Sequence, residues 1–436
     1  MNRAKNIFLL FFISLSLQGF GKTMPPDSNE YYNPDFIHYE DFVYRPNIHS
    51  VIFQQAGVDM SSPILELGSN TRLQLSFDDF DRELKDYRYT LVHCDAAWQP
   101  SDLLFSQYLN GFDEDNIREY AFSVNTIQPY THYNLVFPGD YMQPTLSGNY
   151  LLKVFIGTDR DRPVITRIFR IVEHQVQIEA KIHRPADVSE RETKQTVEFS
   201  IFHSGYKIDD VFTGLKVTLS QNDRLDNAIT NLKPMFIKEN ELDYFYEKGN
   251  VFNGGNEFRY FDTRTLKYKT ERTMNLDYDS LNRIVLFPDE DRSQKSYSIL
   301  PDINGKFYLT LRDNLISDHE GDYAMVYFTL PYPNPLSQGD IYVFGQFTDW
   351  RFKKEAKMAY NFTDHVYRAA IYLKQGYYNY EYVMVRDENK KGDETFIEGN
   401  HFETDNDYTI YVYNRKAGSR YDELIGYRKF NSKDFY

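Results

Sequence analysis

The chain has 436 residues, which is enough for about three domains of ordinary size. Its 64 acidic residues outnumber its 49 basic ones, and a net charge of −15 disfavours binding to nucleic acid and to anionic lipid head groups. The only cysteine is Cys94, so no disulfide can form within the chain and packing must hold the fold together. Tyrosine and phenylalanine are abundant, with 37 and 34 residues, and we expect most of them to fill half-buried positions on strands.

The first 21 residues have the pattern of a cleavable signal peptide. Arg3 and Lys5 precede an apolar run at residues 7–17, and Gly21 followed by Lys22 marks the predicted cleavage point. The apolar run is shorter than the ~20 residues that span a bilayer. A lipid anchor would need a cysteine directly after the cleavage point, and Cys94 lies far downstream of it. We therefore expect an exported protein that is soluble, in a periplasm or beyond it.

Alternation of apolar and polar residues recurs along the rest of the chain and predicts strands with one solvated face. In chain order, this alternation is clear at residues 73–77, 176–182, 197–201 and 215–219. Turn sequences separate such segments, for example at residues 137–140, 253–256 and 302–305. Helical periodicity is weak, and the best candidate is a short helix at residues 101–108 with Ser101 as its N-cap. The pattern indicates a mainly β fold of tandem antiparallel β-sandwiches of immunoglobulin-like type.

Two features divide the chain into three predicted domains. The paired strands expected at residues 151–156 and 164–172 complete a first unit, which places one boundary near residue 173. The proline-dense segment 331–335 suits a stiff interdomain linker, because proline cannot pair in a central strand. The predicted domains are an N-terminal β-sandwich at 24–173, a middle β-sandwich at 174–332 and a C-terminal early-set immunoglobulin-like β-sandwich at 336–436.

The last predicted domain opens with a strand that runs into a turn at Trp350. Residues 345–350 follow a Gly-x-Phe-x-x-Trp pattern that resembles the early-set immunoglobulin-like, glycogen-binding modules of glycogen-active enzymes. In such modules this tryptophan either belongs to the packing or stacks on a sugar. Tyr378 lies in the tyrosine-rich segment 377–382, which suits a sugar platform, a protein contact surface or core packing. Trp350 and Tyr378 are therefore the candidate residues of an alternative, glycan-binding function.

Residue types that carry catalysis or bind metals form no recognisable pattern in the sequence. His93, Cys94 and Asp95 are adjacent, but neighbours on a strand point to opposite faces, so we expect a buried, inert Cys94. The ten histidines include no pair at metal-binding spacing. The acidic segments 289–291 and 405–407 do not match a calcium-binding loop, and we expect solvated charge there. The sequence thus predicts no catalytic, cofactor-binding or metal-binding residue and no cofactor.

A series of motifs in a fixed order resembles one known family. The motifs are LSFDD at 75–79, HCDAAW at 93–98, YLNGF at 108–112, YTHY at 130–133, LSGNY at 146–150, DING at 302–305, KQGYY at 374–378 and EGNHFET at 398–404. Together they resemble the type IX secretion system plug protein family of Bacteroidetes, from about residue 39 to about residue 427. Many motifs in one order are more specific than any one of them.

The resemblance implies a non-enzymatic periplasmic protein. Such a plug closes the periplasmic mouth of the large outer-membrane translocon β-barrel of the type IX secretion system when no cargo is passing. The implied partner is that barrel, and the implied location is the inner face of the outer membrane, without insertion into the membrane and without nucleic acid. The resemblance gives no contact residues. From the residues alone, a periplasmic or surface glycan-binding β-sandwich protein remains the alternative.

Overall fold

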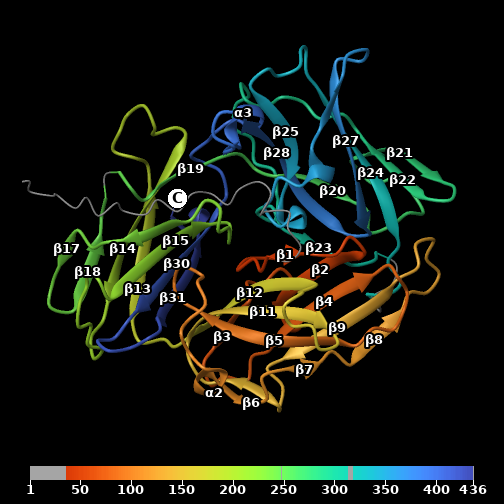
Figure 1. The fold of residues 1–436 in the computed structure, drawn as a ribbon. Coiled ribbons are helices and arrows are strands. Elements are labelled where there is room, and N and C mark those ends of the chain that lie inside the picture. The colour runs from red at the N-terminus through yellow and green to blue at the C-terminus, as the bar shows by residue number, and fades with distance from the viewer. Residues whose placement is uncertain (1–35, 247, 313–317, 436) are drawn as a thin grey trace, which may run out of the picture. The chain divides into compact units, whose positions relative to one another are not determined.

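The structure is a computed structural model that describes residues 36–246, 248–312 and 318–435. It is mainly β, with 44% of residues in strands and 5% in helices, as the alternating sequence pattern predicts. His38–Tyr436 form one compact unit, whose strands build three β-sandwiches with separate hydrophobic cores (Figure 1). The predicted signal peptide at residues 1–21, with Gly21 and Lys22 at its cleavage point, lies outside the described residues.

The first sandwich packs two main sheets face to face. One sheet has the order β1 (Phe42–Val43), β12 (Ile165–Val172), β11 (Gly148–Ile156), β5 (Tyr87–Cys94) and β7 (Asp115–Asn116), with β3 (Ile64–Glu66) parallel to β12. The other sheet has the antiparallel order β2 (Ile48–Gln55), β4 (Leu73–Asp79), β9 (Thr131–Phe137) and β8 (Glu119–Phe122). A separate two-stranded ribbon of β6 (Leu109–Gly111) and β10 (Met142–Pro144) follows the short helix α2 (Phe105–Tyr108).

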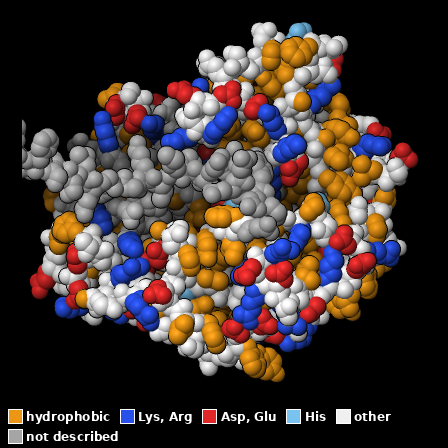
Figure 2. All heavy atoms as spheres, in the orientation of Figure 1, with side chains coloured by type: hydrophobic (Ala, Val, Ile, Leu, Met, Phe, Trp, Pro, Cys, Tyr) orange, Lys and Arg blue, Asp and Glu red, His pale blue; other side chains and the backbone are white. Residues whose placement is uncertain are grey.

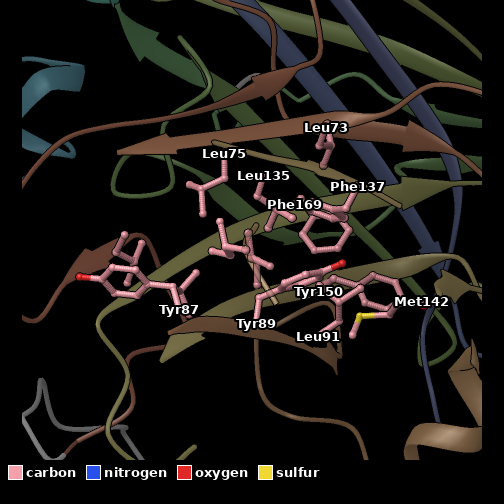
Figure 3. Close-up of a cluster of buried hydrophobic side chains, with 14 of the residues drawn as sticks. Leu73, Leu75, Tyr87, Tyr89, Leu91, Leu135, Phe137, Met142, Tyr150 and Phe169 are labelled. Atoms are coloured by element: carbon pink, nitrogen blue, oxygen red, sulfur yellow. The ribbon is translucent and has the colours of Figure 1, made fainter. Parts of the chain in front are cut away.

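Aliphatic and aromatic side chains of both sheets meet in the core of this sandwich (Figure 3). On β4, Leu73 and Leu75 are fully buried whereas Gln74 is half-buried, so the strand alternates as its sequence predicts. Tyr150 and Phe169 stack with their ring centroids 5.2 Å apart. Burying each large apolar side chain contributes about 1.5–3 kcal/mol relative to exposure. The largest fully buried side chains of the described chain are all tyrosines, so the aromatic content is largely core material.

The second sandwich is built from two distant parts of the chain. One sheet contains β13 (Gln177–His183), β14 (Lys194–Phe202), β18 (Glu241–Tyr244), β17 (Phe236–Ile237) and β19 (Val251–Asn253). The other has the order β16 (Ile229–Leu232), β15 (Leu215–Gln221), β30 (Asp407–Asn414) and β31 (Glu423–Asn431). Figure 1 shows the blue strand β30 beside the green strand β15, and their register joins Leu215 to Asn414. A short 3-10 turn, Ser432–Phe435, follows β31.

The third sandwich lies between these two parts in the sequence. One sheet groups β20 (Arg259–Asp262), β23 (Phe307–Tyr308), β25 (Gly339–Phe344) and β29 (Gly392–Asp393) around the long strand β28 (Tyr377–Arg386). The other has the order β21 (Thr273–Tyr278), β22 (Asn282–Leu286), β24 (Tyr323–Pro331), β27 (Val366–Lys374) and β26 (Ala359–Asn361), with β22 parallel to β24. Helix α3 (Thr395–Glu398) and the 3-10 turns η1 (Gln346–Thr348) and η2 (Lys354–Ala356) complete it.

The strand pairing crosses the predicted boundary between domains 174–332 and 336–436. Strands β30 and β31 of the predicted last domain pair within the second sandwich, and β20 and β23 of the predicted middle domain pair with β28. The segment 331–335 joins β24 to β25, which both belong to the third sandwich. A proline-rich segment is equally suited to a loop inside one sandwich, because it needs only to lack ladder hydrogen bonds.

The predicted helix at residues 101–108 is shorter in the structure, where α2 spans Phe105–Tyr108 and begins after Leu104. Ser101 is therefore not its N-cap. The Ser101 hydroxyl lies 2.9 Å from Nδ1 of His93 instead, and this contact holds the loop that leads into α2.

Candidate functional site

A buried ionic cluster joins the first sandwich to the third. Asp78 lies on β4 directly opposite His132 on β9, and its Oδ1 is 2.6 Å from Nδ1 of that ring. Its Oδ2 accepts hydrogen bonds from the Lys374 ammonium at 2.7 Å and from the Tyr323 hydroxyl at 2.6 Å. Lys374 and Tyr323 stand at the end of β27 and the start of β24, so four strands of two sandwiches meet at one carboxylate. We call these four residues the Asp78 cluster.

The surroundings of Asp78 favour its ionised form. Burial alone would raise its pKa, but the charge of Lys374 and the hydrogen bond from His132 outweigh burial and hold the pKa below its usual value. Lys374 also lies 4.3 Å from the centre of the Tyr130 ring. An aspartate in a catalytic Asp–His dyad stabilises a developing imidazolium. Here the ammonium already neutralises the carboxylate, so the arrangement serves to hold two sandwiches together rather than to move a proton.

A polar cavity of about 320 Å³ lies beside the Asp78 cluster. Its lining includes Gln54, Gln74, His132 and Gln375, from both sandwiches. These side chains offer hydrogen-bonding groups, and the volume is at the lower end of the range for small-molecule sites. The cavity is therefore a place for ordered water or a small polar molecule next to the junction.

Two buried arginines make the other junctions between sandwiches. Arg170 of β12 lies between two aromatic rings, 4.8 Å from the centre of Trp98 in the first sandwich and 3.9 Å from that of Tyr411 in the second. Arg224 of the second sandwich forms an ion pair with Glu394 and lies 4.8 Å from the centre of the Trp350 ring, both in the third. Because guanidinium groups bind carboxylates and aromatic faces together, these contacts suit buried junctions.

Trp350 is half-buried at one of these junctions. Besides Arg224, its ring contacts Phe344 and Phe258, with centroids 5.5 and 6.1 Å away. A Cβ on Gly305 would lie 2.3 Å from the edge of this ring, so the glycine of the DING motif makes room for the tryptophan. These contacts give Trp350 a packing role in this structure.

Tyr378, the other candidate glycan-binding residue, has no exposed ring face. Its exposed fraction is 1%, and its ring stacks on Phe261 and Phe307 at centroid distances of 4.9 and 5.4 Å. Its hydroxyl donates to the carbonyl oxygen of Lys374 at 2.5 Å. A sugar stacks on an accessible aromatic face. The structure thus corrects the hypothesis that Tyr378 forms a sugar platform, because this part of β28 is buried inside the third sandwich.

His93 and Cys94 are also buried, as expected for Cys94. Burial lowers the pKa of His93 to about 4, so its ring is neutral near pH 7. Its Nε2 lies 3.3 Å from the carbonyl oxygen of Ser147, and Nδ1 faces Ser101. Burial raises the pKa of the Cys94 thiol, which disfavours the thiolate that a nucleophile requires.

The two acidic segments differ from each other. Solvated charge is the wrong expectation for Asp289, which is buried and accepts hydrogen bonds from two arginines and two tyrosines: Arg259, Arg272, Tyr380 and Tyr382. Asp405 and Asp407 both accept from the side chain of Asn431. Within the described ranges, no three His, Cys, Asp or Glu side chains are placed to hold a metal ion.

The sequence motifs contained three of the four residues of the Asp78 cluster but did not show that they meet. Asp78 lies in LSFDD, His132 in YTHY and Lys374 in KQGYY. Each motif places a charged or titratable residue among apolar strand residues, which is the only sign in the sequence that these residues are buried. Asp78 and Lys374 are 296 residues apart, so no local pattern pairs them.

Two comparisons relate this geometry to known proteins. Residues 48–173, which contain most of the first sandwich together with Asp78 and His132, match the family model described as type 9 secretion system plug protein 1st domain. The chain is also similar to a solved structure, the crystal structure at 2.30 Å resolution of a hypothetical protein from Parabacteroides merdae ATCC 43184. The two sequences are 34% identical, the TM-score is 0.87, and the similarity covers 91% of this chain and 100% of that chain. A search of curated proteins gave no match.

The described helices give no means of crossing a membrane. Helices α2 and α3 have four residues each, and no helix in the described ranges is long and apolar enough to span a bilayer.

Proposed function

We propose a plugging role in type 9 secretion for this chain, which belongs to the same family as the Parabacteroides merdae protein and contains a plug-protein first domain. In this role it is a non-enzymatic periplasmic protein that closes the periplasmic mouth of the outer-membrane translocon barrel when no cargo passes. The match of residues 48–173 to the plug domain carries the proposal.

The architecture supports a role that depends on a folded body. Closing a wide pore requires a domain assembly that resists deformation, and each sandwich here has its own aromatic-rich core. Buried charges join the three sandwiches: Asp78 and Arg224 form ion pairs with Lys374 and Glu394. Arg170 donates a hydrogen bond to the Tyr413 hydroxyl. Breaking such a pair leaves an uncompensated charge, so the junctions resist separation.

Opening for cargo sets a second requirement on the contact with the translocon. A plug must release, which suits an interface with a small apolar centre and a polar rim rather than an obligate hydrophobic one. The first sandwich carries exposed large apolar side chains among charged ones, including Leu104, Phe112 and Tyr141. Such surfaces are suited to binding another protein.

The glycan-binding alternative has weaker support. It depends on accessible aromatic faces, and Tyr378 is buried while Trp350 is engaged by Arg224, Phe344 and Phe258. Calorimetry with α-glucans and surface polysaccharides tests it, and we expect no heat of binding.

Affinity capture from the native envelope tests the proposed function. The tagged protein is purified from envelopes solubilised in a mild detergent, and the co-purified proteins are identified by mass spectrometry. A tagged periplasmic β-sandwich protein of unrelated sequence serves as the control. We expect specific recovery of the type 9 translocon barrel. Recovery of no such barrel, under conditions that keep the translocon itself intact, would contradict the proposal.

A further inference from the structure

An apolar patch on the first sandwich is formed by the ribbon of β6 and β10 together with α2. Four large side chains at this place are exposed, with fractions of 71% for Leu104, 46% for Phe105, 63% for Phe112 and 58% for Tyr141. Figure 2 shows hydrophobic side chains at the lower edge of the molecule, over α2 and β6 of Figure 1. We call these four residues the ribbon patch. Single exposed apolar residues are ordinary, but a group of four large ones marks a contact surface.

The inner side of the ribbon is firmly held by the core. Tyr108, Leu109 and Met142 are buried in the main cluster of the first sandwich, where Figure 3 shows Met142 beside the other core side chains. The hydroxyl of Tyr108 donates to the carbonyl oxygen of Leu91 on β5 at 3.1 Å. The patch therefore stands on a fixed support, which lowers the entropy lost when it is covered.

A glycine sets the arrangement of the two aromatic rings. Gly111 has φ of +106°, and a Cβ at this position would lie 2.2 Å from the carbonyl oxygen of Tyr141. That same oxygen accepts a hydrogen bond from the backbone N–H of Phe112 at 2.8 Å. The rings of Phe112 and Tyr141 consequently lie side by side, with centroids 6.2 Å apart. Only glycine permits this close approach without strain, which explains its place in the YLNGF motif.

The charges around the patch are mostly acidic. Residues 89–152, which supply the ribbon and α2, contain seven acidic residues and a single cation, Arg118, whose guanidinium forms an ion pair with Asp115. Exposed Asp102 precedes α2, and exposed Asp140 precedes Tyr141. A cation contributed by another element is Arg420, which donates to the side chain of Gln107 in α2 at 3.0 Å. An apolar surface rimmed by carboxylates repels anionic lipid and attracts a protein segment that carries cations.

We propose that the ribbon patch is the docking surface for a protein partner that presents an apolar segment with lysine or arginine beside it. This inference rests on the proposed function, in which the partner is the translocon barrel. The aromatic rings form the apolar centre, where a partner cation can lie over a ring face, and the two carboxylates lie at the rim.

The experiment measures the affinity of the full chain for the purified translocon barrel in detergent, by surface-immobilised binding. The test variant is F112S/Y141S. The matched control is F236S/I237S on β17, because those side chains are exposed to a similar extent, 58% and 50%, on a different sandwich. We expect the ribbon variant to weaken binding at least ~30-fold, as loss of an interface centre does, and the control to stay within ~2-fold of the wild type.

A charge-reversal variant, D102K/D140K, keeps every apolar side chain and so tests the charge argument even if the aromatic variant fails to fold. We expect weaker binding, with the largest difference at low salt. Equal binding by the wild type and both variants would overturn the inference while leaving the proposed function in place. No binding by the wild type would contradict the proposed function and the inference together.

Two further measurements separate other occupants of the patch. Sedimentation of the protein alone detects self-association, and a dimer that F112S/Y141S dissociates would assign the patch to a second copy. Flotation with vesicles of 30% phosphatidylglycerol and 70% phosphatidylethanolamine detects lipid binding, and vesicle binding that this variant abolishes would assign it to membrane. We expect a monomer that does not float, and either contrary result would overturn the inference.

Discussion

Replacing Lys374 by methionine tests whether the Asp78 cluster holds the first and third sandwiches together. Methionine keeps most of the side-chain volume and removes only the ammonium group. Asp78 and Lys374 are buried, with exposed side-chain fractions of 0% and 3%, so the substitution leaves the Asp78 carboxylate without its charged partner. Removing one partner of a buried ion pair typically costs about 3–5 kcal/mol. We expect a loss of this size in the free energy of unfolding of Lys374→Met at pH 7.

A double-mutant cycle isolates the pair itself. Asp78→Asn leaves the ammonium unpaired and should also be destabilising, whereas the double variant should cost about 2–3 kcal/mol less than the sum of the single variants. Urea unfolding is followed by fluorescence of Trp98 in the first sandwich and Trp350 in the third, and coincident transitions justify a two-state treatment. The control is Lys390→Met, because Lys390 forms an exposed ion pair with Asp387 and should change stability by less than about 1 kcal/mol.

The stability that Asp78 contributes depends on pH. The pKa of Asp78 is lowered in the folded protein, so its stabilising contribution is present above the pKa of the unfolded carboxyl and is lost as the pH falls through the folded value. A loss below about 1 kcal/mol for Lys374→Met at pH 7, or additive effects in the cycle, would refute the view that this pair joins the sandwiches.

Three further predictions concern single positions. Burial raises the pKa of Asp302 to about 7, above the unfolded value of about 4, so the free energy of unfolding should fall as the pH rises from 4 to 7. Urea unfolding at several pH values should show a smaller fall in the free energy of unfolding for Asp302→Asn than for the wild type. An equal fall would contradict a raised pKa for Asp302. Gly111→Ala should lower stability by about 1–3 kcal/mol because its Cβ meets the Tyr141 carbonyl, whereas Gly57→Ala, also at positive φ but with open space, should cost less in thermal unfolding. Cys94 should react with a thiol reagent only in denaturant, and rapid labelling of the native protein would contradict its burial.

Much of the fold could be predicted from the sequence because strand alternation is a local property. Leu73, Leu75 and Phe77 repeat with period two, and they are buried on one face of β4 as expected. The grouping of strands was not predictable in the same way. β30 pairs with β15 almost two hundred residues earlier, and the side chains that favour this pairing are ordinary apolar strand residues. The proline-rich segment 331–335 is visible in the sequence, but its composition does not distinguish a loop from a linker.

The contacts between sandwiches were beyond sequence reasoning for a related reason. Asp78, His132 and Lys374 each lie in a motif, but their role as a junction depends on distances that exist only in the folded chain. Tyr378 illustrates the converse, since its segment places tyrosines on both faces of a strand, and the structure buries the ring that the glycan hypothesis needed to be exposed. Tyrosine suits both environments, because its ring packs in a core while its hydroxyl finds an acceptor.

Conductance of the purified translocon barrel in a planar bilayer tests the plugging role most directly. The protein is added to the periplasmic side at a concentration above its measured dissociation constant, and addition to the opposite side is the control. The account predicts that the open-pore conductance falls when the protein is on the periplasmic side and returns after it is washed away. A conductance that stays unchanged while the protein is bound would contradict the proposal that this protein closes the pore.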